Sequence, residues 1–353
     1  MATAVHARTV RARGLAPVPA CATAAFLLVA LGIGLLVGPV DVGIGDILRS
    51  VGARLHVPGV TSSLSPTEET IIWELRVPRV VLAALVGGML SLGGATYQGV
   101  FRNPLVDPYL LGVAAGAGLG ATLAIAYLPR SLDAHEIVPP AAFAGAALAV
   151  AVAYALARSA GGERGPAVLV LAGVTVVAFL TAVQTFVQQQ NTDTLQEVYS
   201  WILGRLPSSG WGDVTLILPY VGVAVGVILL CRRWVDVLTL GDDEAASLGV
   251  NVGRARLTLI AAATVGTAAA VSVSGLIAFV GLIVPHALRL LTGGSYRSLL
   301  PLSFVAGAGF LVLVDAVART VLAPAELPIG VVTAFLGAPF FAVILRTSRR
   351  MIG

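Results

Sequence analysis

The chain has 353 residues, of which 57% are hydrophobic and only 11% are charged, and its mean hydropathy is +0.93. Soluble globular chains do not reach these values, so the composition excludes a water-soluble protein and indicates an integral membrane protein. The net charge of +4 contains no contribution from lysine, because the sequence has none.

Ten apolar stretches, most of them long enough to cross a bilayer as a helix, occupy nearly the whole chain. None shows the alternating pattern of a membrane β-barrel strand. The sequence therefore predicts an all-α polytopic membrane protein with about ten transmembrane helices in one domain, residues 18–346, between tails at 1–17 and 347–353. The predicted spans are Val18 to Val40, Val80 to Val100, Tyr109 to Leu128, Pro139 to Ala157, Ala167 to Val187, Val214 to Cys231, Leu257 to Val273, Leu276 to Leu291, Leu299 to Ala318 and Ile329 to Leu345.

The distribution of arginine predicts the orientation. With ten spans and a cytoplasmic N-terminus, fifteen arginines fall in cytoplasmic segments and seven outside. The positive-inside rule favours this arrangement, which places both termini in the cytoplasm. The charge therefore reflects topology, and we infer no nucleic-acid binding from it.

A first polar break, Arg102 to Pro108 (RNPLVDP), separates two apolar stretches on the cytoplasmic side. Pro104 and Pro108 predict a non-helical connection before a tightly packed helix begins at Gly112. A simple turn between two spans explains the same residues. Glycines four apart at Gly112, Gly116 and Gly120 predict close helix packing, as do two weaker pairs at Gly87 and Ser91 and at Gly222 and Gly226.

The longest cytoplasmic segment, residues 232–256, contains a short amphipathic pattern. Asp242, Asp243 and Glu244 precede apolar residues at helical spacing, and Gly249 suits the helix end. The segment is either an ordinary solvated loop or a docking helix for a partner on the cytoplasmic face.

Catalytic and metal-binding motifs are missing from the sequence. A nucleotide-binding P-loop needs a lysine, so any ATP used by this protein binds to another subunit. The two cysteines and four histidines lack ligand spacing. We therefore expect neither an enzyme nor a resident metal or cofactor.

Several motifs together resemble the FecCD family, the permease subunits of type II ABC importers for ferric siderophores, haem and cobalamin. The resemblance runs from about Val42 to the C-terminus. The motifs that carry it are RVPR (Arg76 to Arg79), GGMLSLGGATYQGVFRNPLVDPYLLGVAAGAGLGA (Gly87 to Ala121), LGDDEAASLGV (Leu240 to Val250), GLIAFVGLIVPHALRLL (Gly275 to Leu291), DAVAR (Asp315 to Arg319) and ELPIGVVTAFLGAPFF (Glu326 to Phe341).

The resemblance implies partners and roles for particular residues. Two permeases, either a homodimer or a paralogous heterodimer, would pair around a central path in the cytoplasmic membrane. ATPase subunits carrying ATP and Mg²⁺ would bind below, and an extracytoplasmic substrate-binding protein above. Asn103 and Leu105 would line the cytoplasmic gate, and Arg76, Arg79 and Arg319 would dock the binding protein. The coupling residues for the ATPase would be Leu240, Gly241, Glu244, Ala245, Leu248 and Gly249.

Asp315 is an acid inside a predicted span, which is costly and often functional. We expect a structural ion pair with Arg319, four residues later on the same helix. A proton relay in a secondary transporter is the alternative from another functional class. For the importer itself we expect a ferric siderophore as substrate, with haem and cobalamin as alternatives.

Overall fold

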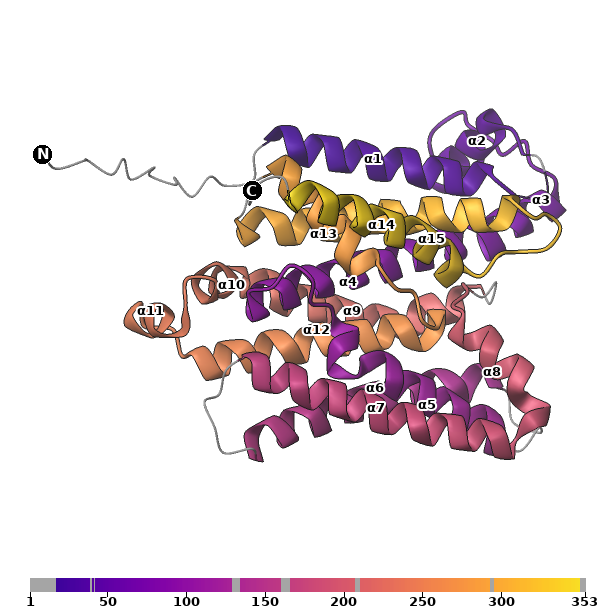
Figure 1. Cartoon of the computed structure of the whole chain (residues 1–353). Helices are drawn as coiled ribbons and strands as arrows, with labels where there is room; N and C mark the ends of the chain where they lie inside the picture. The colour runs from indigo at the N-terminus through magenta and orange to yellow at the C-terminus, as the bar shows by residue number, and fades with distance from the viewer. Residues whose placement is uncertain are drawn as a thin grey trace, which may run out of the picture.

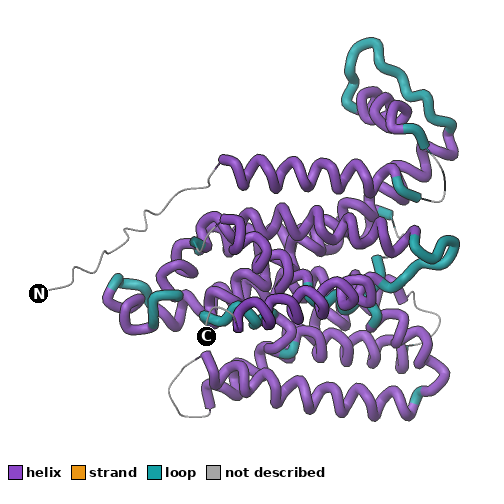
Figure 2. The backbone as a smooth tube through the Cα atoms, turned by 45° about the horizontal axis from the view of Figure 1, so that its top comes forward, coloured by secondary structure: helices purple, strands orange, loops and turns teal. Residues whose placement is uncertain are grey.

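The structure is a computed structural model that describes residues 17–38, 40, 42–128, 134–159, 166–206, 210–292 and 295–349. The predicted tails lie largely outside these residues. Figure 2 shows that the described residues form helices joined by loops, with no strand. The helices are α1 (Pro17–Leu36), α2 (Ile44–Arg54), α3 (Pro66–Thr70), the π-helix η1 (Ile71–Arg76), α4 (Val77–Phe101), the 3₁₀-helix η2 (Pro108–Leu111), α5 (Val113–Tyr127), α6 (Ala134–Ser159), α7 (Pro166–Gln190), the 3₁₀-helix η3 (Thr192–Thr194), α8 (Leu195–Ile202), α9 (Trp211–Leu230), α10 (Arg232–Leu238), α11 (Asp242–Ser247), α12 (Val252–Ser274), α13 (Val280–Thr292), α14 (Tyr296–Thr320) and α15 (Ile329–Arg349).

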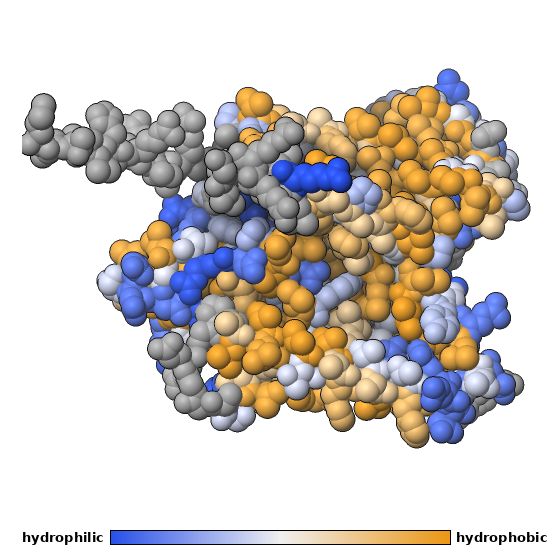
Figure 3. All heavy atoms as spheres, viewed as in Figure 1, coloured by the Kyte–Doolittle hydropathy of each residue, from blue (hydrophilic) through white to orange (hydrophobic). Residues whose placement is uncertain are grey.

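Helices long and apolar enough to cross a membrane dominate the described chain. Seven meet this description, and α5, α13 and α15 contribute three shorter apolar segments. The prediction of an all-α membrane protein with about ten spans is therefore confirmed. Figure 3 agrees, because hydrophobic side chains cover the middle of the face in view and hydrophilic ones gather towards its two ends.

The helices run between two ends of the bundle, one marked by α11 and the other by α8 (Figure 1). We call these the α11 end and the α8 end. The first residue of α1 and the last of α15 both lie at the α11 end. This common side agrees with the even number of predicted spans.

The second span begins earlier than the sequence predicts, because α3, η1 and α4 form one helical segment of 36 residues from Pro66 to Phe101. Glu68, Glu69, Glu74, Arg76 and Arg79 lower the hydropathy of its first part, which hid this part of the helix in the sequence. Within its apolar 18-residue stretch, 83% of the residues are buried, so this stretch lies at the centre of the bundle. Its glycines allow this packing: a Cβ added at Gly87 would collide with the Gly307 carbonyl of α14, and one at Gly94 with the Gly281 carbonyl of α13.

The predicted glycine stripe of α5 packs against α6. A Cβ at Gly116 would collide with the Gly145 carbonyl, and one at Gly120 with the Ala141 carbonyl. The pair on α9 behaves differently, because no described atom outside the helix lies within 4 Å of a Cβ added at Gly222 or Gly226. The spacing therefore predicts the close packing of α5 correctly, whereas no described helix packs closely against the α9 pair.

Two spans are shorter than predicted because non-helical chain enters the bundle. The 3₁₀-helix η2 and Gly112 take the place of the first residues of the span predicted from Tyr109, and non-helical residues 275–279 precede α13. The non-helical connection at 102–107 is as predicted. The segments meet at Tyr109, whose hydroxyl donates to the Ile277 carbonyl (3.0 Å) and accepts from the Ile277 N–H (3.2 Å). Non-helical backbone at membrane depth needs such internal partners, because lipid provides none.

Candidate functional site

Hydrogen bonds and one left-handed residue fix the conformation of the polar turn after α4. Arg102 ends the helix in the left-handed region with φ 53°, and the Asn103 N–H returns to the Gln98 carbonyl (3.1 Å). The Asn103 side chain accepts from the N–H of Leu105 at 2.9 Å, which turns the chain again. Leu105 is left 54% exposed. The predicted gate residues thus lie on an ordered turn with an apolar side chain at its surface.

The predicted coupling residues form a short helix at the end of the bundle. Figure 1 shows α11 standing clear of the main body of helices. Ala245 faces inward and is fully buried, whereas Leu240 and Leu248 are 60% and 62% exposed. Exposed leucines at both ends of a projecting helix provide apolar surface that a partner could cover.

Two glycines define the ends of this helix. Gly241 precedes it with φ 135°, and Gly249 follows it with φ 82°. A Cβ at Gly241 would also collide with the carboxylate of Glu244 in the first turn. Other residues rarely adopt these backbone angles, so glycine is required by geometry at both positions. The amphipathic pattern in the sequence predicted this helix and its end correctly.

One carboxylate joins the turn after α4 to α11. Asp242, the first residue of α11, lies 3.1 Å from the Arg102 guanidinium and 2.9 Å from that of Arg256 on α12. Three elements therefore meet at a single side chain. Sequence reasoning placed Asp242 in the first turn of a helix but missed this role, because no spacing rule links residues 102 and 242.

A second polar contact continues from the same turn into the bundle. Gln98, fully buried near the end of α4, donates to the Gly281 carbonyl at 3.0 Å. Its carbonyl oxygen accepts from Arg289 of α13 at 2.8 Å. A movement of the last turn of α4 would therefore also displace α13 through these two hydrogen bonds.

At the α8 end, arginines hold the last turn of α1. Arg319 donates to the carbonyls of Gly34 (3.1 Å) and Val37 (3.0 Å). Arg76 donates to the Leu35 carbonyl at 3.0 Å and also to that of Val40. The last carbonyls of a helix have no partner within it, so these arginines supply partners that lipid cannot.

Arg79 completes the group and ties three segments together. It bonds Asp315 of α14 at 2.9 Å and Glu326 of the following loop at 2.8 Å. Arg319 lies 3.0 Å from the other oxygen of Asp315, at ion-pair distance but without hydrogen-bond geometry. The hydrogen bond from Arg79 lowers the pKa of Glu326, so this carboxyl is charged at neutral pH.

The arginine cluster is buried, whereas the docking role implied by the family resemblance needs accessible side chains. Arg76 and Arg79 are 5% and 7% exposed, and the Arg319 side chain 6%. The physical reason is that the N–H groups of the arginines donate to carbonyls at the end of α1 and to the Asp315 carboxylate, all within the chain. Docking of a binding protein by these three residues stays a prediction.

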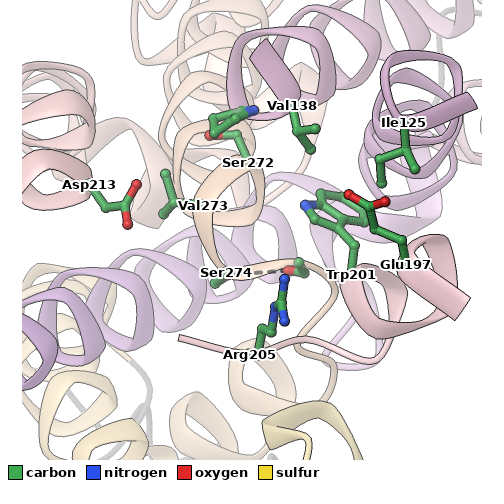
Figure 4. A pocket seen from close by; sticks show the side chains of 11 residues that line it. Ile125, Val138, Glu197, Trp201, Arg205, Asp213, Ser272, Val273 and Ser274 are labelled. Atoms are coloured by element: carbon green, nitrogen blue, oxygen red, sulfur yellow. Dashed lines mark hydrogen bonds between the residues drawn. The ribbon is translucent and has the colours of Figure 1, made fainter. Parts of the chain in front are cut away.

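A small pocket with both polar and apolar lining lies at the α8 end between α8 and α12 (Figure 4). Glu197, Trp201, Arg205 and Asp213 contribute to its lining, and its volume is about 100 Å³. Sites that enclose small-molecule ligands occupy about 300 to 1,000 Å³. This pocket is therefore too small to enclose a bulky chelate.

The fold and these contacts define a polytopic helical membrane protein in which an internal turn is tied to a projecting helix. The sequence matches the model of the FecCD transport family over residues 26–347. The chain belongs to this family, as its motifs predict. The family is one of transport proteins and not of enzymes.

Similar proteins are known among permeases. The chain is 45% identical to the cobalamin import system permease protein BtuC of Halobacterium salinarum, over 79% of this chain and 74% of the relative. It is 39% identical to the iron(3+)-hydroxamate import system permease protein FhuB of Bacillus subtilis, over 80% and 73%. A solved transporter, described as of the metal-chelate ABC type in an inward-facing conformation, superposes with a TM-score of 0.82 at 28% identity, over 94% of this chain and 100% of that one.

Proposed function

We propose that this chain forms the membrane path of an ATP-driven importer for a ferric siderophore or a related metal chelate. ATP and Mg²⁺ bind to partner ATPase subunits, and an extracytoplasmic binding protein delivers the substrate. A second permease copy, identical or paralogous, completes the path. The observation that carries the proposal is family membership over residues 26–347.

The α11 end supports contact with an ATPase. Leu240 and Leu248 offer apolar surface outside the bundle, and Asp242 links the same helix to the turn that holds Asn103 and Leu105. Displacement of α11 by closing ATPase subunits would therefore reach the proposed gate through one ion pair. Discrete contacts of this kind can transmit a two-state movement between sites.

The α11 end faces the cytoplasm in this proposal, with both termini on that side of the cell membrane. Fifteen of the 22 arginines belong to the segments that this orientation places inside, as the positive-inside rule requires. The binding protein then docks at the α8 end. Docking through Arg76, Arg79 and Arg319 would require their buried cluster to open, because their donors are engaged within the chain.

Cobalamin is the second candidate substrate, because the cobalamin permease of Halobacterium salinarum is 45% identical to this chain. Haem is a third chelate of the same class. A proton-coupled transporter with Asp315 as relay is less well supported, because this carboxylate lies between the guanidinium groups of Arg79 and Arg319.

Uptake into proteoliposomes tests the proposal directly. The vesicles would contain this chain and its ATPase, with the binding protein added outside, and would receive ferric siderophore, haem or cobalamin with and without ATP. We expect ATP-dependent accumulation of one chelate that is lost without the binding protein. Uptake by the chain alone, driven by a proton gradient, would overturn the importer and implicate Asp315.

A further inference from the structure

A basic pocket lies at the α11 end, separate from the pocket of Figure 4. The end of α6, the start of α7 and the start of α12 surround it, and its volume is about 310 Å³. Arg158, Arg254 and Arg256 line it together with Tyr154, and its described lining contains no acidic residue. An anion is therefore the ligand that this pocket favours.

Two of the three arginines are available to a ligand. Arg256 is buried and bonds Asp242, so it is already engaged within the chain. Arg158 and Arg254 are exposed, and neither belongs to an ion pair among the described residues. They come from different helices, α6 and α12, and would hold one anion between them.

An apolar cleft continues from this pocket along the bundle. It has a volume of about 750 Å³ and runs between α6 and α12, and it shares Tyr154, Arg158 and Leu257 with the basic pocket. Alanines four residues apart on α6, Ala147, Ala151 and Ala155, form one wall. Leu257, Ile260, Ala261 and Val265 of α12 line the opposite wall.

The polar atoms at the inner end of the cleft are internally satisfied. The Thr264 hydroxyl is hydrogen-bonded to the Tyr97 hydroxyl at 2.8 Å. The remaining cleft surface is mostly aliphatic. A polar solute would therefore find no hydrogen-bond partners there, whereas a hydrocarbon chain would bury its own apolar surface against that of the cleft.

We propose that this composite site binds one anionic phospholipid. Arg158 and Arg254 hold the phosphate of the headgroup, and one acyl chain lies in the cleft between α6 and α12. Basic pockets between membrane helices, next to apolar grooves, suit such headgroups by charge. Binding of the lipid does not depend on the transport function proposed above. Only its assignment to the cytoplasmic leaflet rests on the proposed orientation, in which the α11 end faces the cytoplasm.

Lipid binding to the purified full chain in neutral detergent provides the test. Retention of phosphatidylglycerol or phosphatidylcholine is measured by native mass spectrometry, and thermal stability is measured with each lipid added. We expect phosphatidylglycerol to bind and stabilise more than phosphatidylcholine. The double variant Arg158→Gln/Arg254→Gln is expected to bind it about 30-fold more weakly, because two charges are removed from the headgroup.

Two further variants separate the parts of the site. Ala151→Phe keeps both charges and fills the cleft, so it is expected to weaken phosphatidylglycerol binding although the arginines remain. Arg233→Gln removes an exposed arginine of α10 at the same end but outside the site, and it is expected to leave binding unchanged. This pair keeps the proposal testable if the double variant does not fold.

Three outcomes would overturn the proposal. The first is equal binding of both lipids, and the second is unchanged binding in Ala151→Phe. The third is equal stabilisation by inorganic phosphate, which would mean a free anion. Unchanged retention of phosphatidylglycerol in the double arginine variant would overturn the proposal as well. No outcome depends on transport, so the proposed function is tested separately.

Discussion

At the scale of single residues, Gly249 carries a conformational requirement that its open surroundings do not reveal. Nothing lies within 4 Å of a Cβ added there, yet its φ is 82°. A side chain at this position would therefore not collide with any neighbour. Its cost is the strain of the left-handed backbone conformation, about 1 to 2 kcal/mol for a residue other than glycine.

We expect Gly249→Val to distort the end of α11 and lower the substrate transported per ATP hydrolysed, while the bundle keeps its thermal stability. Gly249→Asn is the matched control, since asparagine tolerates the left-handed region. Measurements of uptake and hydrolysis in proteoliposomes compare the two. Equal coupling in both variants would mean that the backbone angle at this position has no role.

Asp315 is the residue on which the arginine cluster depends. Its side chain is 1% exposed and adjoins both Arg79 and Arg319, whereas the Glu326 side chain is 50% exposed. Removing one partner of a buried ion pair costs about 3 to 5 kcal/mol, and removing an exposed partner costs about 1 kcal/mol or less.

Asp315→Asn is therefore expected to lower the melting temperature in detergent clearly more than Glu326→Gln. Thermal unfolding followed by intrinsic fluorescence measures the difference. Similar losses from the two variants would contradict the central place that the geometry gives to Asp315.

At the scale of elements, the ion pairs of Asp242 join α4, α11 and α12. Asp243, the next residue, provides a matched control because it is exposed and belongs to no ion pair among the described residues. Asp242→Asn keeps the shape of the side chain and removes the charge that Arg102 and Arg256 share.

We expect Asp242→Asn to preserve binding of the ATPase and basal hydrolysis while reducing substrate uptake several-fold. Asp243→Asn should leave both quantities near their original values. If the two variants transport equally well, the contact between Asp242 and Arg102 does not carry movement to the gate.

Helix packing supplies another pair of contrasting positions. A side chain at Gly116 collides with the backbone of α6, whereas one at Gly222 meets no described atom within 4 Å. Overpacking of a close contact costs about 1 to 3 kcal/mol. Gly116→Leu is expected to lower the thermal stability of the chain and Gly222→Leu to leave it unchanged, as measured by unfolding in detergent. Loss of stability in the Gly222 variant alone would reverse this assignment.

These elements also mark the limit of sequence reasoning. Hydropathy predicts the long helices because lipid requires apolar stretches of fixed length. It fails at the starts of two predicted spans, residues 109–112 and 276–279, which are not α-helical and whose backbone finds internal partners such as the Tyr109 hydroxyl. The break at 102–108 was predicted correctly from its two prolines. The helix α11 could be predicted from its amphipathic pattern, because that pattern involves only residues close together in the sequence.

At the scale of the whole molecule, sequence reasoning misses contacts between distant residues. The Asp242 link to Arg102 and the burial of Arg79 among carboxylates depend on the relative positions of α4, α11 and α14, which no local pattern encodes. Family resemblance identified the motifs that contain these residues, but it implied a docking role for the outer arginines and did not predict their burial. The packed structure instead assigns them to the stability of the α8 end.

The meeting of the two non-helical segments at Tyr109 has a consequence for hydrogen–deuterium exchange. The Ile277 amide is protected by a side-chain oxygen from a distant part of the chain, so its exchange rate reports each separation of the segments. Amides within α12 keep helical partners and would stay slow. A Tyr109→Phe chain would exchange fast at Ile277, so one amide would record how often the centre of the permease opens.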